Sequence, residues 1–175
     1  VAAALGVLSL HGILGERNAE AACGRFAAAW EKGFHEAAYR HAHCVEAKQP
    51  AEALSLLQAA ADRGHAAASE QLGRRCLEAR PPDGTCAAAR LEAAAVAGRP
   101  SSKSLLGWLH AQGIGKLRDP ARALALYNEA ADAGDLAAKN NLGEMHESGR
   151  GVPQDARRAF HHYREAAEAG FAPEQ

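Results

Sequence analysis

Histidine and cysteine are the residues of this chain that could bind a metal ion or perform redox chemistry. The chain has nine histidines and four cysteines, and two ligands on one helix that share a metal ion are favoured at a spacing of three or four residues. His41 and Cys44 meet that spacing, whereas His161 and His162 are adjacent and point about 100° apart. A zinc site needs two further ligands, and no Cys-x-x-Cys or His-x-x-x-His motif supplies them. We therefore expect no metal site and no cofactor.

The cysteines Cys23, Cys44, Cys76 and Cys86 are too few and too irregular for a disulfide-rich scaffold. Two bridges are conceivable, one between Cys76 and Cys86 across a hairpin and one between Cys23 and Cys44 of neighbouring units. The favoured interpretation is that all four are buried free thiols that act as small hydrophobic side chains. The redox compartment stays open.

Catalytic motifs are absent from the sequence. It contains no Gly-x-Ser-x-Gly motif and no phosphate-binding loop that ends in Lys-Ser or Lys-Thr. Gly113 and Gly115 belong to a turn between helices, whereas a phosphate loop follows a strand. We therefore expect no enzyme activity within these residues.

Charge and hydropathy exclude two further classes of protein. Twenty basic and 21 acidic residues nearly cancel, so the chain lacks the basic surplus of a nucleic-acid binder. No run approaches the roughly eighteen apolar residues of a membrane span. The opening residues 1–10 lack the basic flank of a signal peptide and are interpreted as a helix. The compartment, cytoplasmic or periplasmic/secreted, remains open.

The elements that carry these residues repeat along the chain. Glycines that close a helix pair recur at intervals of 31, 34, 36 and 36 residues, and a small residue inside the first helix recurs at 36, 31, 34 and 36. Because both series give the same lengths shifted by one unit, the chain is expected to be one solenoid segment, 1–175. Its units span about 1–33, 34–64, 65–98, 99–134 and 135–170, and 171–175 begin a further unit. We expect a piece of a longer polypeptide.

Each unit has the signals of a helix pair. Alanine is the most frequent residue and the best helix former, and β-branched residues are few, so the chain is expected to be all-α. Pro50 and Pro120 fit the first helical position. Trp30 is expected to pack against neighbouring helices rather than to bind a partner. Glycine pairs that permit positive φ end two of the first helices. An Asp or Asn precedes the second helix of four units and can cap its free amides: Asn18, Asp83, Asp119 and Asp155.

The last two units share one pattern, 36 residues apart. It reads Leu142-Gly143, Gly149-x-Gly151-Val152, Asp155, Ala159, Tyr163, Ala166-Ala167 and Gly170, and before it Leu106-Gly107, Gly113-Ile114-Gly115, Asp119, Ala123, Tyr127, Ala130-Ala131 and Gly134. This pattern resembles the Sel1-like repeat (SLR) family, a relative of the tetratricopeptide repeats. Units 1–33 and 65–98 match it less closely, and 34–64 least. The resemblance implies a right-handed α/α superhelical solenoid of about five helix-turn-helix repeats that acts as a non-catalytic adaptor.

In related helical-repeat proteins the first helix of each pair lines a concave face that binds the partner. Two positions on each such helix would face that groove. They are Tyr39, His43, Glu70, Arg74, Ser104, Trp108, Asn140 and Glu144. An exposed Trp is a good interface anchor because it buries a large area at low entropic cost. Packing between helices is the competing interpretation for Trp108, and an intrahelical pair with Glu70 is favoured for Arg74.

The expected function is a protein-protein interaction scaffold that binds a peptide or helix along this face. The main alternative is a structural or regulatory spacer within a larger multidomain protein. A minority alternative is a thiol- or metal-based sensor built on Cys44, Cys76 and nearby histidines. The expected partner is a protein or peptide, with no nucleic acid and no membrane span, and uncapped ends favour self-association.

Overall fold

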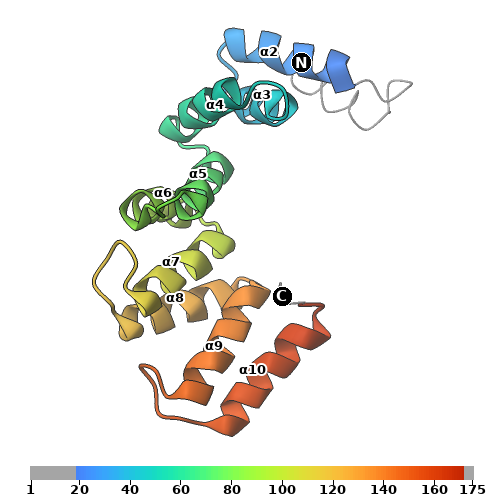
Figure 1. The fold of residues 1–175 in the computed structure, drawn as a ribbon. Helices are drawn as coiled ribbons and strands as arrows, with labels where there is room; N and C mark the ends of the chain where they lie inside the picture. Colours follow the sequence, from blue (N-terminus) through green and yellow to red (C-terminus); the bar gives the residue numbers. More distant parts are fainter. Residues whose placement is uncertain (1–18, 172–175) are drawn as a thin grey trace. The chain divides into compact units, whose positions relative to one another are not determined.

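The computed structural model describes residues 19–171. Every regular element in this range is an α-helix, so the all-α expectation is confirmed (Figure 1). Three predictions lie outside the described range: the cap at Asn18, the first helix of the repeat 1–33, and the further repeat that begins at 171–175, of which only residue 171 is described. The helices are α2 (Ala19–Glu31), α3 (His35–Val45), α4 (Pro50–Asp62), α5 (Ala66–Glu78), α6 (Gly84–Val96), α7 (Pro100–Gln112), α8 (Pro120–Asp132), α9 (Leu136–Ser148) and α10 (Ala156–Glu168).

The closing glycines reverse the chain between one helix pair and the next. All of them have positive φ; that of Gly134 is 89°, a conformation that side chains with a Cβ rarely adopt. The amide of the following Asp135 then donates to the carbonyl of Ala130 at 2.9 Å. This bond satisfies a carbonyl that the helix end leaves free. The sequence prediction for these glycines is confirmed.

The predicted helix starts are also confirmed within the described range. The carboxylates of Asp83, Asp119 and Asp155 accept hydrogen bonds from backbone amides of the first turns of α6, α8 and α10. Pro50 and Pro120 occupy the first position of their helices. These caps place each second helix at a fixed point after its loop, because they satisfy amides that have no partner inside the helix.

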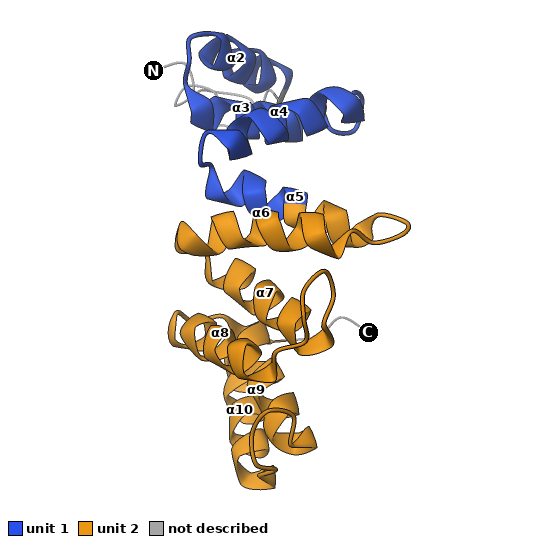
Figure 2. Cartoon of the chain, turned by 90° about the vertical axis from the view of Figure 1, so that its left-hand side faces the viewer, with its two compact units in different colours: residues 1–72 blue, residues 73–175 orange. Residues whose placement is uncertain are grey.

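The chain divides into two compact units, residues 1–72 and 73–175, with the division inside α5 (Figure 2). The core of the first unit is formed by alanines and leucines of α3, α4 and the start of α5, among them Leu57 and Leu72. Trp30 packs against this core, and the guanidinium carbon of Arg63 lies 4.9 Å from its ring centroid. The expected packing role of Trp30 is confirmed.

In the second unit, a glycine of each first helix receives a large side chain of the second helix. A Cβ atom built on Gly107 would lie 2.8 Å from Cε1 of Tyr127, and one on Gly143 would lie 2.6 Å from Cε1 of Tyr163. Tyr127 is buried, with 2 % of its surface exposed. We call this the glycine–tyrosine contact. It brings the two helices of a pair close together at the small residue that recurs in each first helix.

The glycine-rich loop of one pair packs on the second helix of the preceding pair. A Cβ on Gly115 would lie 2.0 Å from the carbonyl carbon of Gly84, the first residue of α6. One on Gly151 would lie 2.6 Å from Cβ of Pro120, the first residue of α8. The loops therefore connect neighbouring pairs and leave no room for a side chain at the contact.

The cysteines correct the sequence analysis. Cys23 is bonded to Cys44, which joins α2 to α3, and Cys76 is bonded to Cys86, which joins α5 to α6. No free cysteine is left, so the interpretation as four free thiols is wrong. The two conceivable bridges are the ones that form, because each pair lies on helices that are packed together. The sensor hypothesis loses the free thiols on which it was built.

The glycine–tyrosine contact can be tested against a glycine that has no neighbour. Gly107→Leu should lower the free energy of unfolding by about 3 kcal/mol, because the new side chain meets the buried Tyr127 ring. Gly24→Leu on α2 should raise it by up to about 1 kcal/mol, since nothing lies within 4 Å of a Cβ there and leucine is the better helix former. Urea unfolding measures both. Equal effects at the two positions would contradict the packing.

The disulfide between Cys23 and Cys44 spans 21 residues and should stabilise the folded chain by about 3 kcal/mol by restricting the unfolded chain. Cys23→Ser/Cys44→Ser should lose that amount in urea unfolding. Ellman titration of the denatured wild type should find no thiol before reduction and four after it. Thiols that titrate before reduction would show that the bridges are absent.

Candidate functional site

A surface pocket of about 360 Å³ lies on the first helices of three successive pairs in the second unit. Apolar atoms dominate its wall. The helices α5, α7 and α9 contribute together because the glycine turns place consecutive first helices side by side. The lining residues are Arg74 and Leu77, then Ser101, Ser104, Leu105 and Trp108, and finally Asp135, Ala137 and Asn141.

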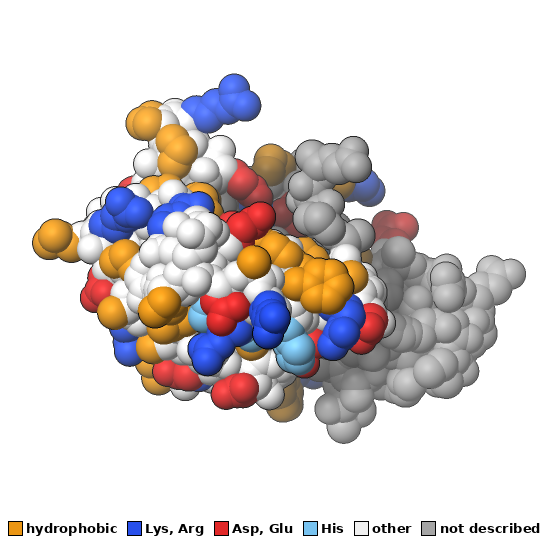
Figure 3. Space-filling view, turned by 90° about the horizontal axis from the view of Figure 1, so that it is seen from below, with side chains coloured by type: hydrophobic (Ala, Val, Ile, Leu, Met, Phe, Trp, Pro, Cys, Tyr) orange, Lys and Arg blue, Asp and Glu red, His pale blue; other side chains and the backbone are white. Residues whose placement is uncertain are grey.

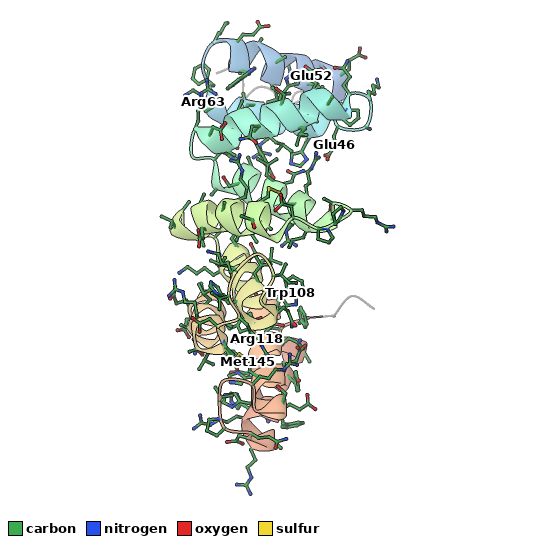
Figure 4. The ribbon with its side chains drawn as sticks, turned by 60° about the vertical axis from the view of Figure 1, so that its left-hand side comes forward. Glu46, Glu52, Arg63, Trp108, Arg118 and Met145 are labelled. Atoms are coloured by element: carbon green, nitrogen blue, oxygen red, sulfur yellow. A yellow bond between two sulfur atoms is a disulfide. The ribbon has the colours of Figure 1, made fainter. Side chains whose placement is uncertain are left out.

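Trp108 is the largest side chain in this pocket. It projects from α7 with 36 % of its surface exposed (Figure 4), although its neighbours Leu106 and Leu109 on the same helix are buried. An aromatic ring that is exposed beside a concave apolar surface is the usual form of an interface anchor. Asp135, which also lines the pocket, caps α9 by accepting a 2.7 Å hydrogen bond from the amide of Ala138.

The pocket brings together three of the eight residues that the sequence placed on the binding face: Arg74, Ser104 and Trp108. Ser104 is only 4 % exposed, so it forms part of the pocket wall and offers little surface to a partner. The sequence analysis missed Leu77 and Leu105, which supply apolar surface. Leu77 lies three residues from Arg74, and Leu105 lies three residues from Trp108. Because residues three apart share a helix face, this spacing could have identified both leucines from the sequence.

The remaining candidates of the second unit pair with each other. The amide nitrogen of Asn140 donates to Oε1 of Glu144 at 3.0 Å, one turn apart on the exposed side of α9. The neighbouring Asn141, rather than Asn140, lines the pocket. A partner would therefore meet Asn140 and Glu144 as a bonded pair beside the pocket.

The three candidates of the first unit are described within that unit. Tyr39 packs against the core, and its ring lies 4.6 Å from that of His43 and 4.5 Å from that of His65, centroid to centroid. His43 is exposed and lies 3.6 Å from the carboxylate of Glu46. Glu70 is only 6 % exposed. Of these three residues, only His43 is exposed to solvent.

Charged side chains of both signs stabilise the helix pairs. On the face shown in Figure 3, acidic and basic side chains are interspersed. Lys103 of α7 donates to Glu129 of α8 at 2.7 Å, and this bond lowers the pKa of the Glu129 carboxyl. The equivalent pair one repeat later, Lys139 and Glu165, is 3.7 Å apart. This arrangement does not resemble a polyanion-binding surface.

Two half-buried histidines carry shifted pKa values for structural reasons. Burial lowers the pKa of His110, and the nearby Lys116 adds to the effect. Burial also lowers the pKa of His162, whose ring stacks on that of His146 with centroids 5.7 Å apart. Nδ1 of each of these three rings is buried without a hydrogen-bond partner among the described residues.

One cluster within the described range could hold a metal ion. Ligand atoms of His161, His162 and Glu165 on α10 all lie within 4.8 Å of one another. Sequence analysis considered the two histidines alone and missed Glu165. The signal was present, because Glu165 follows His161 by four residues and His162 by three, and both spacings bring side chains together on a helix.

Comparisons with known proteins agree with the helix pairs described above. The model of the Sel1 repeat matches residues 35–65, 100–135 and 136–171. The chain belongs to the Sel1 repeat family. The matched segments include the one that sequence analysis ranked as the weakest unit, and they do not include 65–98. Sel1 repeat proteins generally mediate protein–protein interactions through a scaffold fold that is typically non-catalytic.

Solved structures confirm the fold class, an all-α solenoid of helix-turn-helix repeats. A Sel1 repeat protein from Oxalobacter formigenes superposes with a TM-score of 0.89 at 29 % identity, covering 97 % of this chain and 70 % of that one. The protective antigen c5321 of uropathogenic Escherichia coli, which has an SLR fold, gives 0.87 at 26 %, covering 97 % and 38 %. A sel1 repeat protein from Klebsiella pneumoniae gives 0.65 at 23 %, covering 85 % and 74 %.

No curated protein matches this chain. The chain spans little more than a third of the length of the Escherichia coli antigen. Among the described residues no helix is both long and apolar enough to span a membrane. The family is thus established by its repeat and its fold.

The half-buried His110 predicts a pH dependence of stability. Because its pKa is lowered in the folded state, its protonation favours the unfolded state, and stability falls as the pH drops below the ordinary value of about 6.5. His110→Gln removes this contribution, so its melting temperature should fall less than that of the wild type between pH 7 and pH 5. Calorimetry at the two pH values measures the difference. Parallel curves would contradict the shifted pKa.

Proposed function

We propose that the chain is a protein-binding adaptor that takes a peptide or helix of its partner along the first helices α5, α7 and α9. The pocket around Trp108 is the observation that supports this most strongly. It is apolar, it is open to solvent, and three successive repeats line it. Its volume of about 360 Å³ is at the low end of ligand pockets and fits one or two apolar side chains of a partner.

The polar groups around the pocket favour a peptide over a small apolar ligand. Arg74 on one side and Asn141 on the other lie beside the apolar wall. Side chains of these types hydrogen-bond backbone carbonyls or carboxylates of a bound segment, which would fix its direction. Asn140, Glu144 and, in the first unit, Tyr39, His43 and Glu70 remain proposed contacts of a longer segment.

The disulfides bear on where the adaptor works. Bridges of this kind persist in oxidising compartments and are rare in the cytosol. The two bridges therefore favour a periplasmic or secreted setting over a cytoplasmic one. An adaptor there would act on proteins of the same compartment.

Trp108→Ala tests the proposal. The variant should lose at least about 2 kcal/mol of binding free energy, or roughly thirtyfold in affinity, for the partner captured from source-cell extracts. It should stay folded, because the ring is partly exposed. Calorimetric titration measures the affinity, and urea unfolding measures the stability.

Leu117→Ala is the matched control, since Leu117 is an exposed apolar residue, 92 % accessible, that does not line the pocket. It should bind as the wild type does. If Trp108→Ala mainly destabilises the chain and leaves the affinity unchanged, the spacer hypothesis replaces the adaptor.

A further inference from the structure

The second helix of the last described repeat carries two neighbouring histidines that the preceding repeat lacks. The two helices align with a shift of 36 residues, so His161 and His162 stand where the earlier repeat has Ala125 and Leu126. Glu165 stands where the earlier repeat has glutamate too, at position 129. Two imidazoles have thus been added beside a carboxylate that the repeat already carries.

The geometry of these three side chains fits a metal ion. Their ligand atoms lie within 4.8 Å of one another, and Nδ1 of His161 is 3.7 Å from Oε2 of Glu165. Bonds of about 2.1 Å in a tetrahedral zinc site put neighbouring ligand atoms roughly 3.4 Å apart. The distance of 3.7 Å between His161 and Glu165 is already close to this value.

The surroundings hold one ligand in place. The ring of His162 stacks on the ring of His146 from α9, with 9° between the ring planes. His146 itself is buried, with 7 % of its surface exposed. This packing limits the orientations of the His162 ring. Preorganised ligands bind metal more tightly than free ones because less conformational entropy is lost.

Glu165 has a competing structural role, which the earlier repeat lets us weigh. Lys139 lies 3.7 Å from Oε2 of Glu165, whereas the equivalent Lys103 bonds Glu129 at 2.7 Å. The carboxylate of the last repeat is therefore held less tightly by its lysine. The same oxygen, Oε2, faces both Lys139 and His161, and a bound cation would take the place of the lysine contact.

We propose that His161, His162 and Glu165 form a binding site for a divalent transition metal, zinc by its ligand set. Two imidazoles and one carboxylate are a common zinc ligand set and leave a fourth position for water. The site lies on α10, whereas the pocket lies on the first helices, so the proposal does not rest on the adaptor function.

Isothermal titration of the chelator-stripped chain with zinc chloride tests the site. The wild type should bind one zinc ion with an affinity at least tenfold higher than that of either ligand variant, His162→Leu or Glu165→Gln. His162→Leu installs the residue that the preceding repeat carries at this position, so it should keep the fold. Circular dichroism and the melting temperature without metal check this.

His43→Ala is the matched control. His43 and Glu46 form another histidine–carboxylate pair, 3.6 Å apart. Among the described residues this pair does not belong to a group of three candidate ligands. This variant should bind zinc as the wild type does. Unchanged affinity in both ligand variants, or no zinc binding by the wild type, would overturn the proposed site.

Discussion

The close approach of two helices at a glycine is the contact on which each pair of the second unit depends. Gly107 and Gly143 leave the space that the rings of Tyr127 and Tyr163 fill, and in the third pair Gly73 receives Leu91 in the same way. A core built mainly from alanine and leucine has few large side chains, so a buried ring such as that of Tyr127 adds substantially to its apolar surface. The contact also fixes which face of the first helix remains outside. That face carries Trp108.

The loops extend this order from one pair to the next. Gly115 meets Gly84, and Gly151 meets Pro120, with no space for a Cβ atom. Each loop is thus held against the start of the preceding pair's second helix, and the second helix of its own pair follows from a fixed point. Stability in such an array is a sum of similar interfaces between neighbours. The pocket on α5, α7 and α9 is a consequence, because it needs three first helices in register.

The helix pairs could be predicted from the sequence because their signals are local. Closing glycines, aspartate caps and first-position prolines each act within a few residues, and the structure places Asp119 and Gly134 as expected. The disulfides were misjudged because spacing along the chain does not show which helix faces pack together. Three of the residues proposed from the sequence line the pocket. Trp108 follows from its position in the repeat, whereas the burial of Glu70 depends on neighbours that the pattern does not reveal.

We propose that the partner binds the first helices and does not bind the second helices. A photocrosslinking amino acid at Leu105, which lines the pocket, and at Val96 on α6, which is 90 % exposed, compares the two faces directly. The account predicts that Leu105 forms a crosslinked product with the partner and that Val96 does not. A product from Val96 with none from Leu105 would show that the partner binds the other face.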